Sequence, residues 1–91
     1  MQITEVRIRP TNAGRLRARV SITINNSFMI RDIKVIQRRQ RYVVEFPRRR
    51  QPDGSYLDIA APINAEARKM IELRILAEYE KTTGERVTQR R

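Results

Sequence analysis

The sequence has 91 residues, with 20 Lys and Arg against 10 Asp and Glu, a formal net charge of +10, a pI near 11.4, and neither histidine nor cysteine. These counts exclude a disulfide framework, a thiolate nucleophile and a redox couple, and they leave a zinc site without its usual ligands, so no cofactor or metal is expected. The length predicts one domain with a thin core. A soluble chain in the reducing cytoplasm is expected, because no secretory signal is visible and no apolar run approaches the roughly 20 residues of a membrane span.

Two alternating segments predict a first β-hairpin. Residues 2–9 alternate between apolar and polar side chains and stop at Pro10, which predicts a strand that ends there. Residues 11–14 are typical of a turn, and Gly14 can adopt a positive φ. Residues 16–24 alternate without interruption and predict a second strand. We expect one solvent-facing side of this hairpin to carry Arg15, Arg17 and Arg19.

The next segments predict a second turn and two further strands. Residues 25–27 (NNS) suit a tight hairpin turn. The alternation in residues 28–37 slips near Asp32, which indicates either a β-bulge or a central strand covered on both faces; we favour the bulge. Residues 37–40 then connect to a strand over 41–46, which Pro47 ends.

A basic loop separates these strands from a helix. Residues 48–55 are rich in Arg and contain a Pro-Asp-Gly turn, and residues 56–59 are predicted to form a short fifth strand. From an N-cap at Asn64 the period becomes helical up to about 81–83, with Gly84 as the residue that ends the helix. The apolar face of this helix is expected to contain Ala67, Met70, Ile71, Leu73, Ile75 and Ala77, and two i,i+4 ion pairs are expected, Arg68 with Glu72 and Arg74 with Glu78.

These elements together predict an α+β fold. We expect an antiparallel sheet of four to five strands, followed by one C-terminal helix that packs on the sheet or on a dimer. Residues 1–83 are predicted to form the single domain, and residues 84–91 are predicted to form a flexible, polar and basic tail.

Catalysis has few candidate groups in this sequence. The glycines are scattered at positions 14, 54 and 84, which excludes a glycine loop that cradles phosphate. Asp53 and Asp58 each have an ordinary role available in a turn or a strand, and the tyrosine hydroxyls have no evident base beside them. We therefore expect no enzyme and no small-molecule substrate.

Basic clusters are the stronger candidates for function. Of the 20 basic residues, 17 are Arg, whose planar guanidinium matches phosphate oxygens and stacks on bases, although a GC-rich genome is an alternative reason for the ratio of Arg to Lys. Tyr42 and Tyr56 flank the triple-Arg segment and either stack on unpaired bases or pack in the core, and we favour the core. A membrane surface is a poor alternative partner, because the helix carries both signs of charge. The clusters outside the first hairpin are Arg38, Arg39 and Arg41, and Arg48, Arg49 and Arg50.

Several segments together resemble one known family. Residues 46–54 (FPRRRQPDG), followed by residues 58–64 (DIAAPIN), resemble the signature of the SpoVG family, the stage V sporulation protein G or septation proteins of bacteria. Segments 3–9, 14–18, 21–24 and 32–36 agree with the same family. The likeness covers about residues 2–80.

The resemblance implies a small α+β protein that forms a homodimer through its strands and binds DNA and RNA as a regulator, without enzymatic activity. The basic pair of the family corresponds to Arg49 and Arg50, which become the leading candidates for nucleic-acid contacts. Arg48 stands where the family has a small residue and adds charge to the same segment. Arg38, Arg39 and Arg41 are expected to assist. The alternative is a non-enzymatic interaction module that binds an acidic protein partner in septation control.

Overall fold

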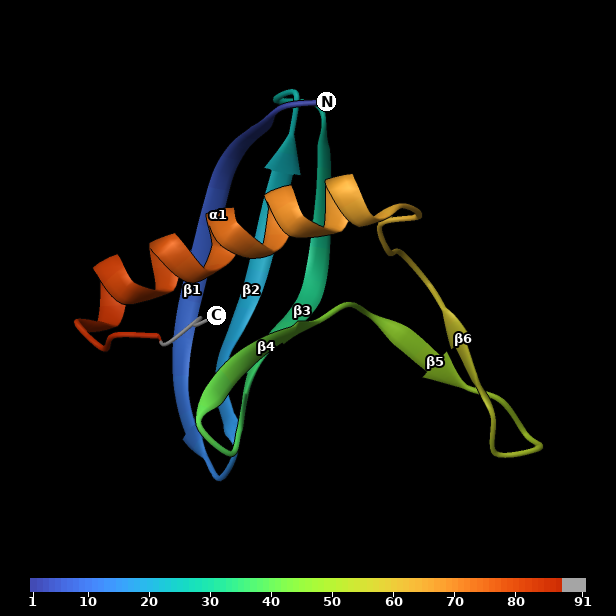
Figure 1. The fold of residues 1–91 in the computed structure, drawn as a ribbon. Helices are drawn as coiled ribbons and strands as arrows, with labels where there is room; N and C mark the ends of the chain where they lie inside the picture. Colours follow the sequence, from blue (N-terminus) through green and yellow to red (C-terminus); the bar gives the residue numbers. More distant parts are fainter. Residues whose placement is uncertain (88–91) are drawn as a thin grey trace.

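The computed structural model describes residues 1–87, which form a four-stranded sheet, a two-stranded sheet and one helix (Figure 1). The larger sheet is antiparallel with the strand order β1-β2-β3-β4, where β1 is Ile3–Ala13, β2 is Leu16–Ile24, β3 is Phe28–Arg38 and β4 is Arg41–Glu45. The smaller sheet pairs β5 (Arg48–Arg50) with β6 (Tyr56–Asp58), and α1 spans Ala65–Thr83. The predicted α+β class is confirmed.

β1 is longer than its alternation predicts. The strand continues past Pro10 to Ala13, with a shift of register between these two residues. Because β1 is an outer strand of the sheet, the missing N–H of Pro10 need not break the ladder. The hydroxyl of Thr11 donates to the carbonyl of Leu16 at 2.6 Å, and Gly14 turns the chain with a φ of 63°. The prediction that the first strand ends at Pro10 is therefore wrong.

The hairpin between β2 and β3 follows its prediction. Asn25 and Asn26 have φ angles of 52° and 53°, the left-handed conformation that tight hairpin turns require. In β3, the register shifts between the pairs of Val20 and Ile22, and Asp32 at this point has a φ of 62°. The β-bulge near Asp32 is confirmed. β3 is an inner strand, between β2 and β4, but it is not covered on both faces, because Ile33 and Val35 are buried whereas Phe28 and Met29 are 73% and 50% exposed.

α1 lies across one face of the larger sheet (Figure 1), and the core lies between them. The side chain of Asn64 caps the helix by accepting from the backbone N–H of Ala67 at 2.7 Å, and Gly84 ends it with a φ of 77°. The buried core residues are Ile3, Ala18, Val20, Ile22, Ile33, Val35 and Val44 from the sheet and Ile71, Ile75, Leu76 and Tyr79 from the helix. The predicted cap, helix and helix end are confirmed.

The buried stripe of α1 differs from the predicted apolar arc. Met70 and Leu73 are 39% and 54% exposed, whereas Leu76 and Tyr79 are buried in their place. At 100° per residue, the six residues of the predicted apolar face span an arc of about 200°. A sheet covers only one side of a helix, so that arc cannot be buried completely. Of the two predicted ion pairs, Arg68 and Glu72 form theirs at 3.5 Å, whereas Arg74 donates to the carbonyl of Ile3 at 3.3 Å.

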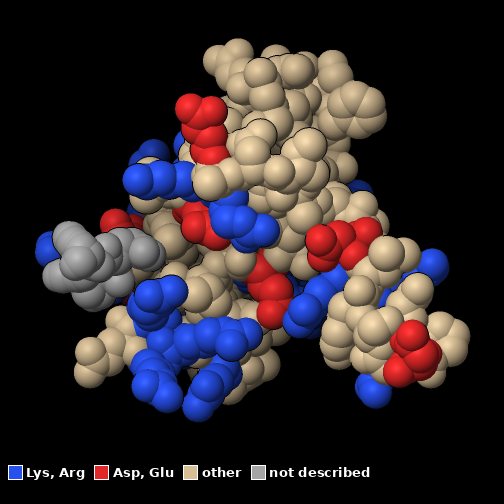
Figure 2. All heavy atoms as spheres, turned by 45° about the vertical axis from the view of Figure 1, so that its right-hand side comes forward, with Lys and Arg blue, Asp and Glu red and all other residues tan. Residues whose placement is uncertain are grey.

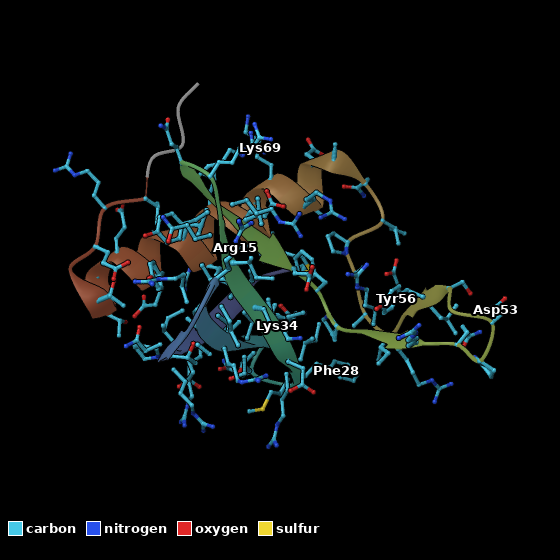
Figure 3. The ribbon with its side chains drawn as sticks, turned by 90° about the horizontal axis from the view of Figure 1, so that it is seen from below. Arg15, Phe28, Lys34, Asp53, Tyr56 and Lys69 are labelled. Carbon is cyan, nitrogen blue, oxygen red and sulfur yellow. The ribbon has the colours of Figure 1, made fainter. Side chains whose placement is uncertain are left out.

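The other face of the larger sheet, which we call the open face, has no helix over it within residues 1–87. Successive side chains of a strand point to opposite faces. Arg19 lies between the buried Ala18 and Val20, and Lys34 lies between the buried Ile33 and Val35, so both point away from α1. Figure 3 shows Lys34 on the side of the sheet opposite Lys69 of the helix.

Arg17 is the exception on β2. A register shift between Leu16 and Ala18 breaks the alternation, and the guanidinium of Arg17 donates to the carboxylate of Glu85, beyond the end of α1, at 2.9 Å. The prediction that Arg15, Arg17 and Arg19 share one solvent-facing side is therefore wrong for Arg17, because the bulge turns its side chain toward the end of the helix.

The triple-Arg segment forms a strand and not the loop that its composition predicts. β5 and β6 form a hairpin, which we call the arm (residues 48–58), and it projects away from the larger sheet (Figure 1). The expected fifth strand exists as β6, but it pairs with β5 alone. Backbone amides of Ile59 and Ala60 donate to the carbonyl of Pro47 at 2.9 and 3.4 Å and close the base of the arm.

The expected flexible tail begins at Gly84. Glu85 accepts hydrogen bonds from Arg17, Tyr42 and Tyr79, and the backbone amide of Val87 donates to Glu80 at 2.7 Å. Positions 88–91 of this predicted tail lie outside the described residues. No helix in the described part of the chain is long and apolar enough to cross a membrane.

Candidate nucleic-acid interface

Basic side chains are concentrated toward one end of the molecule. Figure 2 shows them gathered at the lower end, whereas the upper end, where the turn between β2 and β3 lies in Figure 1, is mostly uncharged. The sequence explains this asymmetry, because residues 20–30 contain no charged side chain. A polyanion is therefore attracted mainly to the end that carries the β3–β4 turn.

The β3–β4 hairpin presents three of the predicted arginines at its tip. Arg38 and Arg41 are direct cross-strand partners, and Arg39 occupies the turn between them with a φ of 55°. All three are exposed. Like charges opposite one another on a sheet destabilise it, so a bound anion at this tip would relieve the repulsion.

Glu45 connects this tip to the base of the arm. Its Oε2 atom lies 3.7 Å from Nη2 of Arg38 and 3.4 Å from Nη2 of Arg48. The two guanidinium groups, which are ten positions apart in the sequence, thus share one carboxylate. We call the cluster of Arg38, Glu45 and Arg48 the basic corner. It brings the two predicted clusters, 38–41 and 48–50, into one surface.

Strand geometry separates the two arginines that the family resemblance singled out. Arg50 faces Tyr56 across the arm and Arg49 faces Leu57. Because neighbouring side chains of a strand point to opposite faces, Arg50 shares its face of the arm with Arg48, whereas Arg49 lies on the other face. One flat ligand surface cannot contact Arg49 and Arg50 in the same way.

Tyr56 lies open on the arm beside these arginines. Its side chain is 55% exposed, and the guanidinium carbon of Arg48 lies 4.3 Å from the centre of its ring. The expectation that Tyr56 packs in the core is wrong, because the arm stands away from the core. The same expectation is confirmed for Tyr42, whose ring packs 5.5 Å from that of Tyr79 and whose hydroxyl donates to Glu85 at 3.0 Å.

Asp53 closes the turn of the arm. Its carboxylate accepts from the hydroxyl of Ser55 at 2.6 Å and from the backbone N–H of Ser55 at 2.9 Å. These two bonds hold the pKa of Asp53 below its ordinary value. Asp53 lies at the far end of the arm, away from Lys34 on the sheet (Figure 3). The negative charge at the tip favours phosphate contacts at the base of the arm over contacts at its end.

The open face carries a further basic surface, of which the sequence patterns predicted only Arg19 on the solvent-facing side of the first hairpin. Arg9 is the cross-strand partner of Arg19, and Arg19 is the partner of Lys34. These residues lie 10 and 15 positions apart in the sequence, so they do not form a visible cluster there. Only the strand register, including the bulge at Asp32, places them in one row.

The family comparison covers most of the chain. The family model described as SpoVG matches residues 1–81. The chain belongs to the SpoVG family. The match includes all seven elements of the fold except the last two residues of α1, and it confirms the resemblance carried by the segments around the Pro-Asp-Gly turn.

Individual SpoVG relatives match along almost the whole chain. The chain is 48% identical over 89 residues to a protein of Clostridium acetobutylicum, covering 97% of this chain and 94% of that protein. It is 46% identical to a relative of Clostridium beijerinckii over 98% of this chain and 99% of that protein. A Bdellovibrio bacteriovorus relative is 48% identical over 89% of this chain and 75% of its own length. All three carry the name of a septation protein SpoVG. The family is thus named for septation and not for a catalysed reaction.

Proposed function

We propose that this SpoVG-family chain is a regulatory protein without catalytic activity that binds DNA or RNA through the basic corner and the adjoining arm. The observation that supports this most directly is the shared contact of Arg38 and Arg48 with Glu45, at 3.7 and 3.4 Å. It joins the β3–β4 tip and the arm into one exposed surface with a large excess of positive charge. A phosphate backbone is the polyanion whose oxygens fit a set of guanidinium groups.

The composition of this surface suits contacts to phosphate. Arg39, Arg41, Arg49 and Arg50 are all exposed around the basic corner, and none of them forms an ion pair within residues 1–87. Their charge is therefore free for a ligand. Phosphate contacts of this kind fix position and carry little sequence information by themselves.

Tyr56 adds a contact of a different kind. Its exposed ring is held by the guanidinium of Arg48 at 4.3 Å, and such a cation–π contact contributes roughly 0.5–1 kcal/mol at an exposed site. An aromatic ring beside basic side chains stacks on unpaired bases in many single-strand-binding proteins. We assign Tyr56 this role at the arm.

We also propose that the protein acts as a homodimer. Apolar side chains on and after the arm are left uncovered, with Leu57, Ile59 and Ile63 exposed by 51%, 66% and 95%. An isolated two-stranded hairpin is marginally stable in water, and the single-chain core is small. A second copy that covers these side chains would stabilise the arm.

Binding titrations test the proposed function. Fluorescently labelled single-stranded DNA, duplex DNA and RNA are titrated with the protein between 50 and 200 mM salt. We expect binding whose logarithm falls linearly with the logarithm of salt concentration. Absence of binding to all three nucleic acids at 50 mM salt would refute the proposal. Retention of an acidic protein in a pull-down after nuclease treatment, together with that absence, would favour an acidic protein partner instead.

A further inference from the structure

The open face carries a row of like charges across three strands. Arg9 of β1, Arg19 of β2 and Lys34 of β3 are successive cross-strand partners. Side chains that are directly opposite on a sheet have Cβ atoms about 4.5–5.5 Å apart, and like charges in this arrangement are destabilising. The row therefore costs stability in the free protein.

A groove runs beside this row. It has a volume of about 600 Å³, and the basic side chains that line it are Arg7, Arg9, Arg19 and Arg31. The bulge at Asp32, with its φ of 62°, places Arg31 on the lining. Asp32 is the only acidic residue there, so four guanidinium groups face one carboxylate.

The charge of the groove is not neutralised by the protein itself. Within residues 1–87, Arg9, Arg19, Arg31 and Lys34 form no ion pair, and Arg7 contacts Glu5 in an exposed pair at 3.0 Å. Exposed pairs of this kind contribute little to stability and exchange readily with other anions.

The row leads directly to the basic corner. Lys34 is the cross-strand partner of Glu45, and Glu45 contacts both Arg38 and Arg48. Basic side chains therefore extend from β1 at one edge of the sheet across the open face to Lys34, and Glu45 alone separates Lys34 from Arg38 and Arg48 at the base of the arm. Figure 3 shows that this face lies on the side of the sheet away from the helix.

We propose that the open face binds the phosphate backbone of a nucleic-acid duplex, as an extension of the basic corner. The inference rests on the proposed function, because it assigns a second contact surface for the same ligand. Strands lie about 4.8 Å apart, so the row of three charges spans about 10 Å, which corresponds to roughly three phosphates of one strand at 3.4 Å of rise each.

The absence of aromatic side chains favours a duplex here. The residues that line the groove include none with an aromatic ring, and sequence-independent binding of single strands relies on bases stacked on such rings. Phosphate contact alone suits a duplex, in which the bases are already stacked and paired. The open face and Tyr56 on the arm thus serve different parts of a nucleic acid.

The test uses two double variants of equal charge. Arg9→Gln with Arg19→Gln removes two charges from the open face, and Lys69→Gln with Lys81→Gln removes two exposed charges from the helix on the other side of the sheet. Binding to a 20-base-pair duplex is measured from 50 to 200 mM salt. For the open-face variant we expect a slope of log K against log salt that is shallower by about 1.8. Raising the salt from 50 to 200 mM should then weaken its binding by a factor that is roughly 12 times smaller than the factor for the wild type. The helix variant should keep the wild-type slope.

The outcomes separate this inference from the proposed function. A wild-type slope in the open-face variant, with normal binding by the wild type, overturns the inference and leaves the arm as the binding surface. Equal losses on duplex and single-stranded DNA also overturn it. If the wild type binds no nucleic acid, the proposed function itself is refuted. The melting temperature of the free open-face variant should be equal to or above that of the wild type, because a repulsive row has been relieved.

Discussion

The hydroxyl of Tyr79 donates a hydrogen bond of 2.6 Å to the carboxylate of Glu85, so the second residue beyond the helix is tied to the last buried residue of the helix. Tyr42 and Arg17 donate to the same carboxylate at 3.0 and 2.9 Å. Glu85 thereby joins α1 to β2 and β4 at the end of the molecule opposite the arm.

This network predicts a stability that depends on pH. The hydrogen bond from Tyr79, assisted by those from Tyr42 and Arg17, holds the pKa of Glu85 below its ordinary value of 4.5. A carboxyl group whose pKa is lower in the folded state contributes stability above its ordinary pKa, and this contribution is lost as the pH falls through the folded value. The Glu85→Gln variant should therefore be less stable than the wild type at pH 7, and the difference should shrink as the pH falls below 4.5.

Urea unfolding at pH 7 and pH 3 measures this difference. The side chain of Glu85 is 37% exposed, so solvent screening limits the expected difference at pH 7 to about 0.5–1 kcal/mol. A Glu72→Gln variant, which removes a carboxylate from the exposed pair with Arg68, is the control and should be close to the wild type. A difference for Glu85→Gln that is the same at both pH values would contradict the prediction.

Neutralising Glu45 should strengthen binding to nucleic acid. In the free protein its carboxylate competes with phosphate for Arg38 and Arg48. The Glu45→Gln variant frees both guanidinium groups, and we expect a salt slope that is steeper by about 1 to 2. Its stability should change by no more than about 0.5 kcal/mol, because the side chains of Arg38 and Arg48 are 59% and 43% exposed and water screens both ion pairs. Weaker binding in a fluorescence titration would show that Glu45 is needed to hold the arginines in place.

Arg49 and Arg50 should contribute unequally. Arg50 shares its face of the arm with Arg48 and Tyr56, and Arg49 points to the other face. We expect Arg50→Ala to reduce the salt slope by about 0.9, the value of one phosphate contact, and Arg49→Ala to reduce it less. Both variants should keep the wild-type melting temperature, because both side chains are exposed. Equal effects in a salt series would show that the ligand contacts both faces of the arm.

Replacing Tyr56 should affect single strands more than duplexes. Stacking of a base on an aromatic side chain contributes about 1–3 kcal/mol, so Tyr56→Ala should weaken binding to a single-stranded oligonucleotide by roughly that amount. Tyr56→Phe keeps the ring and serves as the matched control. If both variants bind like the wild type in the same titration, Tyr56 does not stack on bases.

A charge placed on the arm should disrupt the proposed dimer. Leu57 is 51% exposed on β6, and Leu73 is 54% exposed on α1, so the two leucines offer a matched pair. We expect Leu57→Asp to give the 10.8 kDa monomer in light scattering, while Leu73→Asp keeps the mass of the wild type, because a buried unpaired charge is costly only where a partner covers it. A wild-type mass of 10.8 kDa at micromolar concentration would exclude the dimer.

Local patterns in the sequence predicted most of the secondary structure. The uninterrupted alternation of residues 16–24, the Asn-Asn turn, the slip at Asp32 and the caps at Asn64 and Gly84 each correspond to the element found there. These features depend on steric contacts and hydrogen bonds between residues that are close in the sequence, so the local sequence is sufficient to predict them. The end of β1 was predicted wrongly, because Pro10 breaks a strand only where its missing N–H faces a partner strand.

The basic character of the protein was also readable from the sequence, but the shape of the basic surface was not. Composition placed an excess of arginine in the segments 38–41 and 48–50, and the family resemblance selected Arg49 and Arg50. The contact of Arg38 and Arg48 with Glu45 and the row of Arg9, Arg19 and Lys34 depend on which strands lie side by side and in which register.

The sequence by itself thus determined the family, the class of fold, the turns and the sign of the charge, because each of these follows from residue types and from spacings of a few positions. The tertiary structure alone decided that the triple-Arg segment is one strand of a projecting arm, that Arg17 turns inward, and that the open face carries a basic row. The physical reason is that the register between strands determines which residues are cross-strand partners, and the partners in this row are 10 and 15 positions apart in the sequence. One bulge changes which side chains meet and which face they share.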